Sequence, residues 1–257
     1  MPYEEYAAYH PQLHPCLPRL RDIVRRMQMQ GLRASQKYEL EIRLGTAGRD
    51  GAPFAPGVSR EHFETVLERM QEAGRAGTWV AHRPWHTVVD IIGASGLRTR
   101  MELGAQTTFT HTVKKKVQVA DFVSSSPSMV DMRAGLSVEE EYARPDTVLD
   151  APKLVRVRSR TVFLYGGSER APLWRFDLSR VWQGDTMQQA MDRMHSNYPP
   201  RYEMEVELEN PTHAFEQAEA KLRKTPDGDV HAYIATSILL KTLTIVPYRD
   251  VWWQPNT

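Results

Sequence analysis

Charged and apolar residues alternate strictly in several stretches of the chain, of which residues 38–45 are the first. The apolar positions of this stretch are Leu40, Ile42 and Leu44, and the charged positions are Glu39, Glu41 and Arg43. Because successive side chains leave a β-strand on opposite faces, this alternation predicts a strand with one apolar and one charged face.

The same alternation recurs further along the chain, but the sign of the charge changes from stretch to stretch. Residues 201–209 are acidic and carry Glu203, Glu205 and Glu207 on one face. The basic stretches carry Arg98 with Arg100, Lys114 with Lys116, and Arg156 with Arg158 and Arg160. Two mixed stretches carry Asp131, Arg133 and Glu139, and Arg175 with Asp177. At least six strands therefore have one charged face.

An ordinary antiparallel sheet, with its polar face in water, accounts for any one of these strands. It does not account for rows of like charge, since carboxylates about 6 to 7 Å apart repel by roughly 2 to 3 kcal/mol at an effective dielectric constant near 20. We therefore predict an α+β fold in which about eight antiparallel strands close into a barrel, or tunnel. Its interior would be charged, and its apolar outer face would lie under helices.

Apolar residues at helical spacing predict the flanking helices. We expect them at residues 15–30, 59–73, 186–195, 211–224 and 229–242, and in the third of these we expect Met187, Ala190, Met191 and Met194 on the buried side. Residues 46–56 read as a loop and residues 166–172 as an extra-long hairpin connection. No linker is evident, so we predict a single domain over residues 1–257. It would comprise an N-terminal segment and helix (1–36), barrel strands (37–210), and C-terminal helices with a tail (211–257).

Composition limits the classes of function. The 33 basic and 32 acidic residues give a net charge of +1, which argues against broad coating of nucleic acid. One cysteine, Cys16, leaves no internal disulfide. Residues 1–12 lack the apolar core of a secretory signal, and the most apolar run, 232–246, is interrupted by Lys241. We expect a soluble protein that does not bind membranes.

The candidate chemistry is that of phosphate and a hard metal ion. The chain has neither a P-loop nor a dinucleotide-binding glycine motif at a strand-to-helix turn. The pairs His10 with His14 and His82 with His86 contain prolines, so we expect no zinc site there. Paired glutamates supply only oxygen ligands, which suit Mg²⁺ or Mn²⁺, and rows of arginine match phosphate oxygens. Together they predict a site for a polyphosphate end.

The ordered set of charged stretches resembles the triphosphate tunnel metalloenzymes. Within that superfamily it is most similar to the metal-dependent RNA 5′-triphosphatases of mRNA capping in fungi, protozoa and some viruses, and the size is that of the small protozoan members. The resemblance implies a divalent-metal-dependent hydrolase that removes the γ-phosphate from triphosphate-ended pre-mRNA. The diphosphate end that remains would then accept the guanylyl group, so this is the first step of capping.

Carried over position by position, the resemblance assigns roles to individual residues. The metal ligands would be Glu39, Glu41 and Glu207. The catalytic residues would be Glu139, which orients the attacking water, Glu205, which holds a metal-bound water, and the phosphate-binding Arg156, Arg158 and Arg160. Further substrate contacts would come from Arg43, Arg98, Arg100, Lys114, Lys116 and Arg133, and Glu203 and Asp177 would brace the basic side chains. Arg158 departs from the pattern, since a lysine is commoner there.

Several alternatives remain open at this stage. An inorganic tripolyphosphatase or a thiamine or nucleoside triphosphatase of the same fold usually has lysine at the position of Arg43. A second alternative is a nucleotidyl cyclase. A third is a phosphate-sensing module or capping scaffold that binds without turnover. The expected partners are the 5′-triphosphate end of RNA, nucleoside triphosphates or tripolyphosphate in vitro, and a guanylyltransferase. We expect a monomer, and the inferred role in capping implies a nuclear location.

Overall fold

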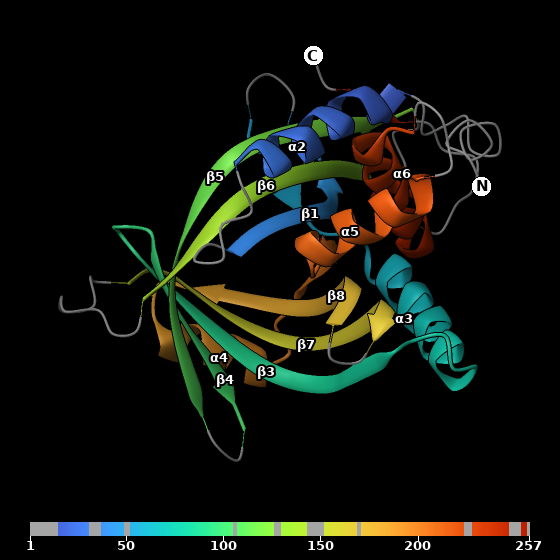
Figure 1. Cartoon of the computed structure of the whole chain (residues 1–257). Coiled ribbons are helices and arrows are strands. Elements are labelled where there is room, and N and C mark those ends of the chain that lie inside the picture. The colour runs from blue at the N-terminus through green and yellow to red at the C-terminus, as the bar shows by residue number, and fades with distance from the viewer. Residues whose placement is uncertain are drawn as a thin grey trace.

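Eight antiparallel strands close into a barrel in the computed structural model of the chain (Figure 1). The structure describes residues 15–30, 37–48, 52–104, 107–125, 130–142, 152–168, 171–223, 228–246 and 253–255. The barrel strands are β1 (Lys37–Thr46), β3 (Ala81–Gly93), β4 (Leu97–Leu103), β5 (Thr108–Ser124), β6 (Asp131–Tyr142), β7 (Pro152–Ser168), β8 (Ala171–Gly184) and β9 (Arg201–Leu208). The predicted α+β barrel of eight antiparallel strands is confirmed.

The ring closes because β1 pairs with both β6 and β9. Around it the order is β1, β6, β5, β4, β3, β7, β8, β9 and back to β1. Two short strands lie outside the ring, where β2 (Ala55–Pro56) pairs with β1 and β10 (Trp253–Pro255) pairs with β5. The interior of the barrel is therefore enclosed by hydrogen-bonded strands on all sides.

Five α-helices flank the barrel in the described part of the chain, and their starts follow from the capping residues. They are α2 (Leu17–Met29), α3 (Arg60–Arg75), α4 (Met187–His195), α5 (Pro211–Leu222) and α6 (Val230–Thr242), the last followed by the 3₁₀ turn η2 (Leu243–Ile245). The Ser59 side chain accepts a hydrogen bond from the His62 N–H at 3.1 Å, and Thr186 and Asp229 cap α4 and α6 in the same way. No described helix combines the length and the apolar character needed to cross a bilayer.

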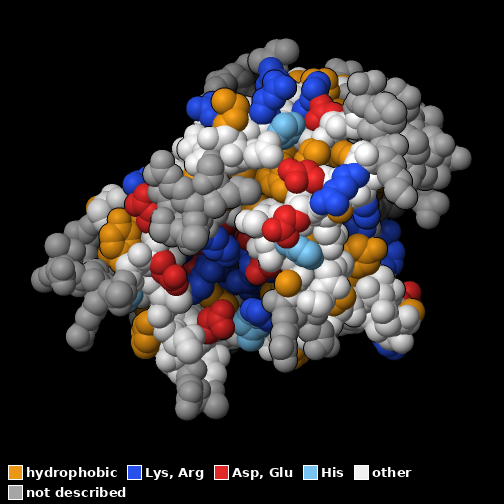
Figure 2. Space-filling model, in the orientation of Figure 1, with side chains coloured by type: hydrophobic (Ala, Val, Ile, Leu, Met, Phe, Trp, Pro, Cys, Tyr) orange, Lys and Arg blue, Asp and Glu red, His pale blue; other side chains and the backbone are white. Residues whose placement is uncertain are grey.

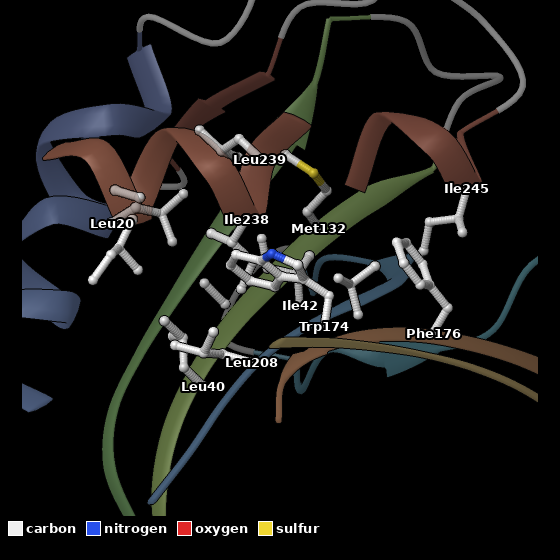
Figure 3. Close-up of a cluster of buried hydrophobic side chains, with 14 of the residues drawn as sticks. Leu20, Leu40, Ile42, Met132, Trp174, Phe176, Leu208, Ile238, Leu239 and Ile245 are labelled. Carbon is white, nitrogen blue, oxygen red and sulfur yellow. The ribbon is translucent and has the colours of Figure 1, made fainter. Parts of the chain in front are cut away.

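The main hydrophobic core lies outside the barrel, between its outer face and the helices (Figure 3). Leu20 of α2 and Ile238 of α6 are fully buried there, together with Leu40 and Ile42 of β1. A smaller core lies under α4 and contains Val155, Val157 and Ala190, among others. Because the apolar side chains point outward to these cores, the charged residues that alternate with them point into the barrel.

Three local predictions were wrong. Met187 is 39% exposed, because α4 covers the barrel with one narrow face on which Ala190 is the buried residue. The predicted loop at 46–56 contains the short strand β2. The predicted hairpin between the arginine strand and the Trp174 strand is confirmed, but its connection is shorter than residues 166–172. β7 and β8 stay paired up to Ser168 and Ala171, and the left-handed Gly166 and Gly167 lie within β7. His10, His14 and the tail from Tyr248 up to β10 lie outside the described residues.

Candidate functional site

The predicted site residues come from seven strands, and most of them meet on the inner wall of the barrel. On neighbouring strands β1 and β9, Glu41 is the direct partner of Glu207, and Arg43 is the direct partner of Glu205. Lys114 of β5 lies opposite Glu139 of β6. Figure 2 shows basic side chains gathered in a hollow of the molecule, with acidic ones beside them. The barrel therefore brings acidic and basic rows face to face.

Three of these glutamates form an acidic cluster that is held by two lysines. The residues Glu39, Glu41 and Glu207 are only 6%, 8% and 4% exposed. Lys114 Nζ lies 2.5 Å from Glu39 Oε2 and 3.2 Å from Glu41 Oε1. Lys37 Nζ lies 3.9 Å from an oxygen of Glu39 and 3.9 Å from Glu207 Oε1. Two ammonium groups thus lie beside the three carboxyl groups of the predicted metal site.

Two carboxyl groups of this cluster have pKa values that are shifted in opposite directions. Burial raises the pKa of Glu207 to about 8, Arg175 opposes the shift, and the negative charge of Glu39 adds to it. Burial also disfavours charge on Glu39, but Lys114, Lys37 and Arg175 outweigh it and hold the pKa of Glu39 well below its usual range. Glu39 is therefore ionised near neutral pH, whereas Glu207 carries a proton below its pKa of about 8.

The cluster fits a hard divalent cation. Its donors are all carboxylate oxygens, the kind that Mg²⁺ and Mn²⁺ prefer. Glu207 Oε1 is buried and makes no hydrogen bond with the described residues. In the described part of the chain, no three acidic, histidine or cysteine side chains already form a metal-binding group. The two lysines occupy the surroundings of these oxygens instead, so an ion would take over their neutralising role.

Each arginine of the predicted phosphate-binding row on β7 contacts a carboxylate from another strand. Arg156 Nη2 lies 2.5 Å from Glu203 of β9, Arg158 Nη2 lies 2.8 Å from Asp90 of β3, and Arg160 forms a two-pronged pair with Asp177 of β8. These carboxylates fix the side chains in place. They do not use all of the donors, because the buried Nε–H groups of Arg156 and Arg158 have no hydrogen-bond acceptor among the described residues.

Arg158 lies among other arginines of this wall. Burial lowers its pKa to about 10; Asp90 raises it, and the nearby Arg100, Arg160 and Arg156 lower it further. The guanidinium remains charged at neutral pH, but it is incompletely neutralised by its neighbours. Such a group, with a free N–H, is suited to a phosphate oxygen.

Glu139 and Glu205 are buried carboxylates with opposite tendencies. Burial and the charge of Glu39 raise the pKa of Glu139, whose nearest arginine atom is Arg98 Nη1 at 3.7 Å. Burial also opposes charge on Glu205, but Arg43, with its Nε 3.0 Å away, and further cations lower its pKa to about 2. Glu205 is therefore permanently ionised, whereas Glu139 can accept a proton more readily than an ordinary glutamate.

The remaining predicted contacts are spread along the tunnel. Arg100 Nε lies 2.9 Å from Asp90, so Arg100 belongs to the same wall as Arg158. Arg133 instead pairs with Asp121 at 2.6 Å and lies over the ring of Phe54. Lys116 is exposed. The structure brings Arg98 and Arg100 close to the acidic and basic clusters and leaves Arg133 engaged elsewhere.

The inner-wall residues that were not among the predicted site residues include Lys37, Arg175 and Asp90. Lys37 extends the alternation of Glu39 and Glu41 by one step, and Arg175, which pairs with Glu207, shares a face with Asp177. Their position in the pattern could have identified both. Asp90 is the only charged residue in the apolar run from Val88 to Ile92, so no alternating pattern indicated that its side chain faces the tunnel.

The closed antiparallel barrel of this chain is the tunnel fold that the Pct1 RNA triphosphatase also has. Solved structures similar to this chain include the Pct1 RNA triphosphatase of S. pombe, with a TM-score of 0.64 and 15% identity over 91% of this chain and 93% of that chain. The same enzyme in complex with the Spt5 CTD has a TM-score of 0.63 and 16% identity, over 90% of this chain and 91% of the other. The mimivirus capping-enzyme triphosphatase has a TM-score of 0.49 and 10% identity, over 86% and 97%.

Comparison by sequence matches no family model and no curated protein. At 15% identity the likeness to Pct1 establishes the fold alone, so the chemistry must be argued from the residues on the tunnel wall.

Proposed function

We propose that this protein is a divalent-metal-dependent RNA 5′-triphosphatase, which hydrolyses the γ-phosphate of triphosphate-ended pre-mRNA and leaves a diphosphate end. One observation carries the proposal: buried arginine N–H groups without acceptors lie in the same enclosed tunnel as a cluster of glutamates. A substrate that satisfies both must carry several anionic oxygens and bind together with a cation. The fold shared with Pct1 supports the same conclusion.

Different residues of the tunnel wall would bind the metal ion and the phosphates. Glu39, Glu41 and Glu207 would hold Mg²⁺ or Mn²⁺, and a bound ion supplies neutralisation of charge on the phosphate oxygens. Arg156, Arg158 and Arg160 would bind the phosphates from the opposite wall. Because Glu203, Asp90 and Asp177 already fix these arginines, little reorganisation is needed when the substrate enters.

Glu139 would orient the attacking water. A buried carboxylate with a raised pKa is a better proton acceptor near neutral pH than an ordinary glutamate. In the hydrolysis, the water oxygen forms a bond to the γ-phosphorus, and the bond from that phosphorus to the oxygen bridging to the β-phosphate breaks. Inorganic phosphate leaves, and the RNA keeps a diphosphate end.

The proposal extends to the cellular role. Removal of the γ-phosphate prepares RNA for guanylyl transfer, so we propose mRNA capping as the process, a guanylyltransferase as the next enzyme and the nucleus as the location. Pct1 has been solved in complex with the Spt5 CTD, which supports a comparable protein partner for the present chain.

Phosphate release from three substrates tests the activity. We expect metal-dependent release from 5′-triphosphate RNA, with a higher kcat/KM than for ATP or tripolyphosphate, and no release after chelation with EDTA. Release from tripolyphosphate but not from RNA would instead identify an inorganic tripolyphosphatase. Tripolyphosphate binding that survives EDTA, without any turnover, would identify a phosphate-sensing module, and a cyclic nucleotide product would identify a cyclase.

Substitution of Lys37 tests the competition between lysine and metal. Because Lys37 Nζ lies within 3.9 Å of both Glu39 and Glu207, Lys37→Gln removes a positive charge from the surroundings of the ion. We expect Mn²⁺ to bind about 3- to 10-fold more tightly, as for one half-exposed charge at this range, measured by titration calorimetry. Lys115→Gln is the matched control, since Lys115 pairs with Glu140 on the outer surface. An equal increase in Mn²⁺ affinity in Lys37→Gln and Lys115→Gln would contradict the prediction.

The pH dependence of metal binding tests the role of Glu207. With a pKa of about 8, Glu207 carries a proton below pH 8 in the metal-free protein, and an ion that binds it must displace this proton. We expect the apparent affinity for Mn²⁺ to rise by up to about tenfold per pH unit between pH 6 and 8, and to level off above pH 8. Calorimetry in buffers of different ionisation enthalpy should show release of one proton. An affinity that is flat from pH 6 to 9 would refute this assignment.

A further inference from the structure

A cavity of about 400 Å³ lies outside the tunnel, between the β7–β8 hairpin and the helices α5 and α6. Figure 1 shows α5 close to β8 at this end of the barrel. Tyr165 and Trp174, which line the cavity, are direct partners across the hairpin and belong to the outer hydrophobic core. The next residue after Trp174 is Arg175, which points into the tunnel and pairs with Glu207. The wall of the barrel thus separates the cavity from the candidate active site.

The larger part of the cavity lining is apolar. Leu173 and Trp174 come from β8, and Ile234 and Leu240 come from α6. Gly166 lies beside them, and a Cβ there would make ordinary contacts, 3.4 Å from Leu173 Cδ1 and 3.7 Å from Trp174 Cδ1. Walls of this kind suit a bulky apolar side chain.

The charged residues of the lining are both basic. Lys241 Nζ lies 3.9 Å from the centre of the Tyr165 ring, and Lys221 Nζ donates a hydrogen bond to the Tyr233 hydroxyl at 3.0 Å. No acidic side chain lines the cavity in the described part of the chain. The ammonium of Lys241 therefore rests on an aromatic face, an arrangement that a carboxylate can replace at little cost.

A buried polar group points to a ligand independently of the lysines. Thr236 lines the cavity from α6 and is 7% exposed, and its Oγ1 has no hydrogen-bond partner among the described residues. A helical threonine commonly bonds to a carbonyl of the preceding turn, as Thr242 does with Ile238. An unsatisfied buried hydroxyl is costly. Because solvent does not reach this hydroxyl, a bound polar group would satisfy it after the Thr236 side chain rotates toward the cavity.

We propose that this cavity binds an acidic peptide segment of a partner protein. A large apolar side chain of the peptide lies between Leu173 and Trp174, flanking carboxylates pair with Lys241 and Lys221, and a peptide backbone group bonds to Thr236. The apolar walls distinguish this ligand from a free polyphosphate, which would leave them in contact with water. This site is independent of hydrolysis in the tunnel and goes beyond the proposed function.

A titration of the full-length, isotope-labelled protein tests the proposal by NMR. The probe is an acetylated five-residue peptide with one central tryptophan and two aspartates on each side. We expect amide shifts at Gly167, Thr236 and Lys241, and a Kd that Lys241→Gln raises about fivefold or more, the loss expected for one ion pair. The matched control, Lys115→Gln, should bind as the wild type does. Ser237→Phe, which fills the cavity from α6, should abolish the shifts.

Three outcomes would overturn the proposal. One is equal binding of a peptide in which asparagine replaces aspartate, since it would leave no role for the lysines. Another is the same set of shifts with a short RNA oligonucleotide. The third is self-association of the wild-type protein that is lost in Ser237→Phe. This result would mean that a second copy of the chain occupies the cavity. Well-dispersed spectra and unchanged RNA phosphate release in both variants show that they are folded, and separate failure of this proposal from failure of the enzymatic one.

Discussion

Glu41→Ala and Glu207→Ala are each expected to reduce metal-dependent phosphate release from 5′-triphosphate RNA by about 10²- to 10³-fold or more, the loss typical of removing a major electrostatic element. The two residues are direct partners on β1 and β9 and face the tunnel together. Removing either leaves the remaining oxygens unable to hold the ion against Lys114 and Lys37, which already neutralise them. Initial rates at saturating RNA and a series of Mn²⁺ concentrations measure the effect.

Glu140→Ala is the control for these variants. Glu140 follows Glu139 on β6, but it points to the outer surface, where it pairs with Lys115 at 2.9 Å. We expect this variant to keep the wild-type rate, whereas Glu139→Ala should lose activity. Near wild-type release by Glu41→Ala or Glu207→Ala at saturating metal would refute the assignment of the acidic cluster as the metal site.

Arg158→Ala is expected to lower kcat by about 10²- to 10³-fold, whereas Arg158→Lys should stay within about tenfold of the wild type. Arg158 is buried beside Arg100, Arg156 and Arg160 and keeps an N–H without an acceptor. Lysine preserves the charge but loses the fork of donors, so we expect the larger part of its effect in KM. Steady-state kinetics with RNA separate the two parameters.

Loss of Arg158 also affects Asp90, which would remain buried with Arg100 as its partner at 2.9 Å. Thermal unfolding should therefore accompany the kinetics, so that unfolded protein is not counted as lost catalysis. Arg180→Ala provides the matched control, because Arg180 lies on the outer face of β8 and pairs with Glu64. Equal losses of kcat in Arg158→Ala and Arg180→Ala would contradict a role for Arg158 in phosphate binding.

Alternation along the strands was sufficient to predict many of the charged residues that line the tunnel. Glu39, Arg156 and Glu205 could be placed on the inner face because their apolar neighbours needed the outer one, and period-two alternation allows only that solution. The helices followed from their periodicity and from caps such as Ser59 and Thr186. Long, regular patterns therefore defined both the barrel and its polarity.

Pairings between strands could not be predicted in the same way, because they depend on register. Arg158 finds Asp90 because β7 lies beside β3 in the ring, and Lys37 reaches Glu207 because β1 closes on β9. Asp90 itself belongs to no alternating charged stretch, so a single sequence does not identify it as a tunnel residue. The hairpin connection at Gly166 was predicted too long because glycines there signal a turn, whereas their left-handed conformation is accommodated within a strand.

The position of β1 between β6 and β9 has a consequence for biogenesis. On the ribosome, β1 emerges long before β9, so the two halves of the acidic cluster meet only when nearly the whole ring has been synthesised. Contacts between such distant parts of a chain make folding slow. Until then Glu41 is without Glu207. The nascent polypeptide exposes the apolar outer face of its strands and a row of charged side chains that lack their partners. Chaperone assistance would matter most in this period.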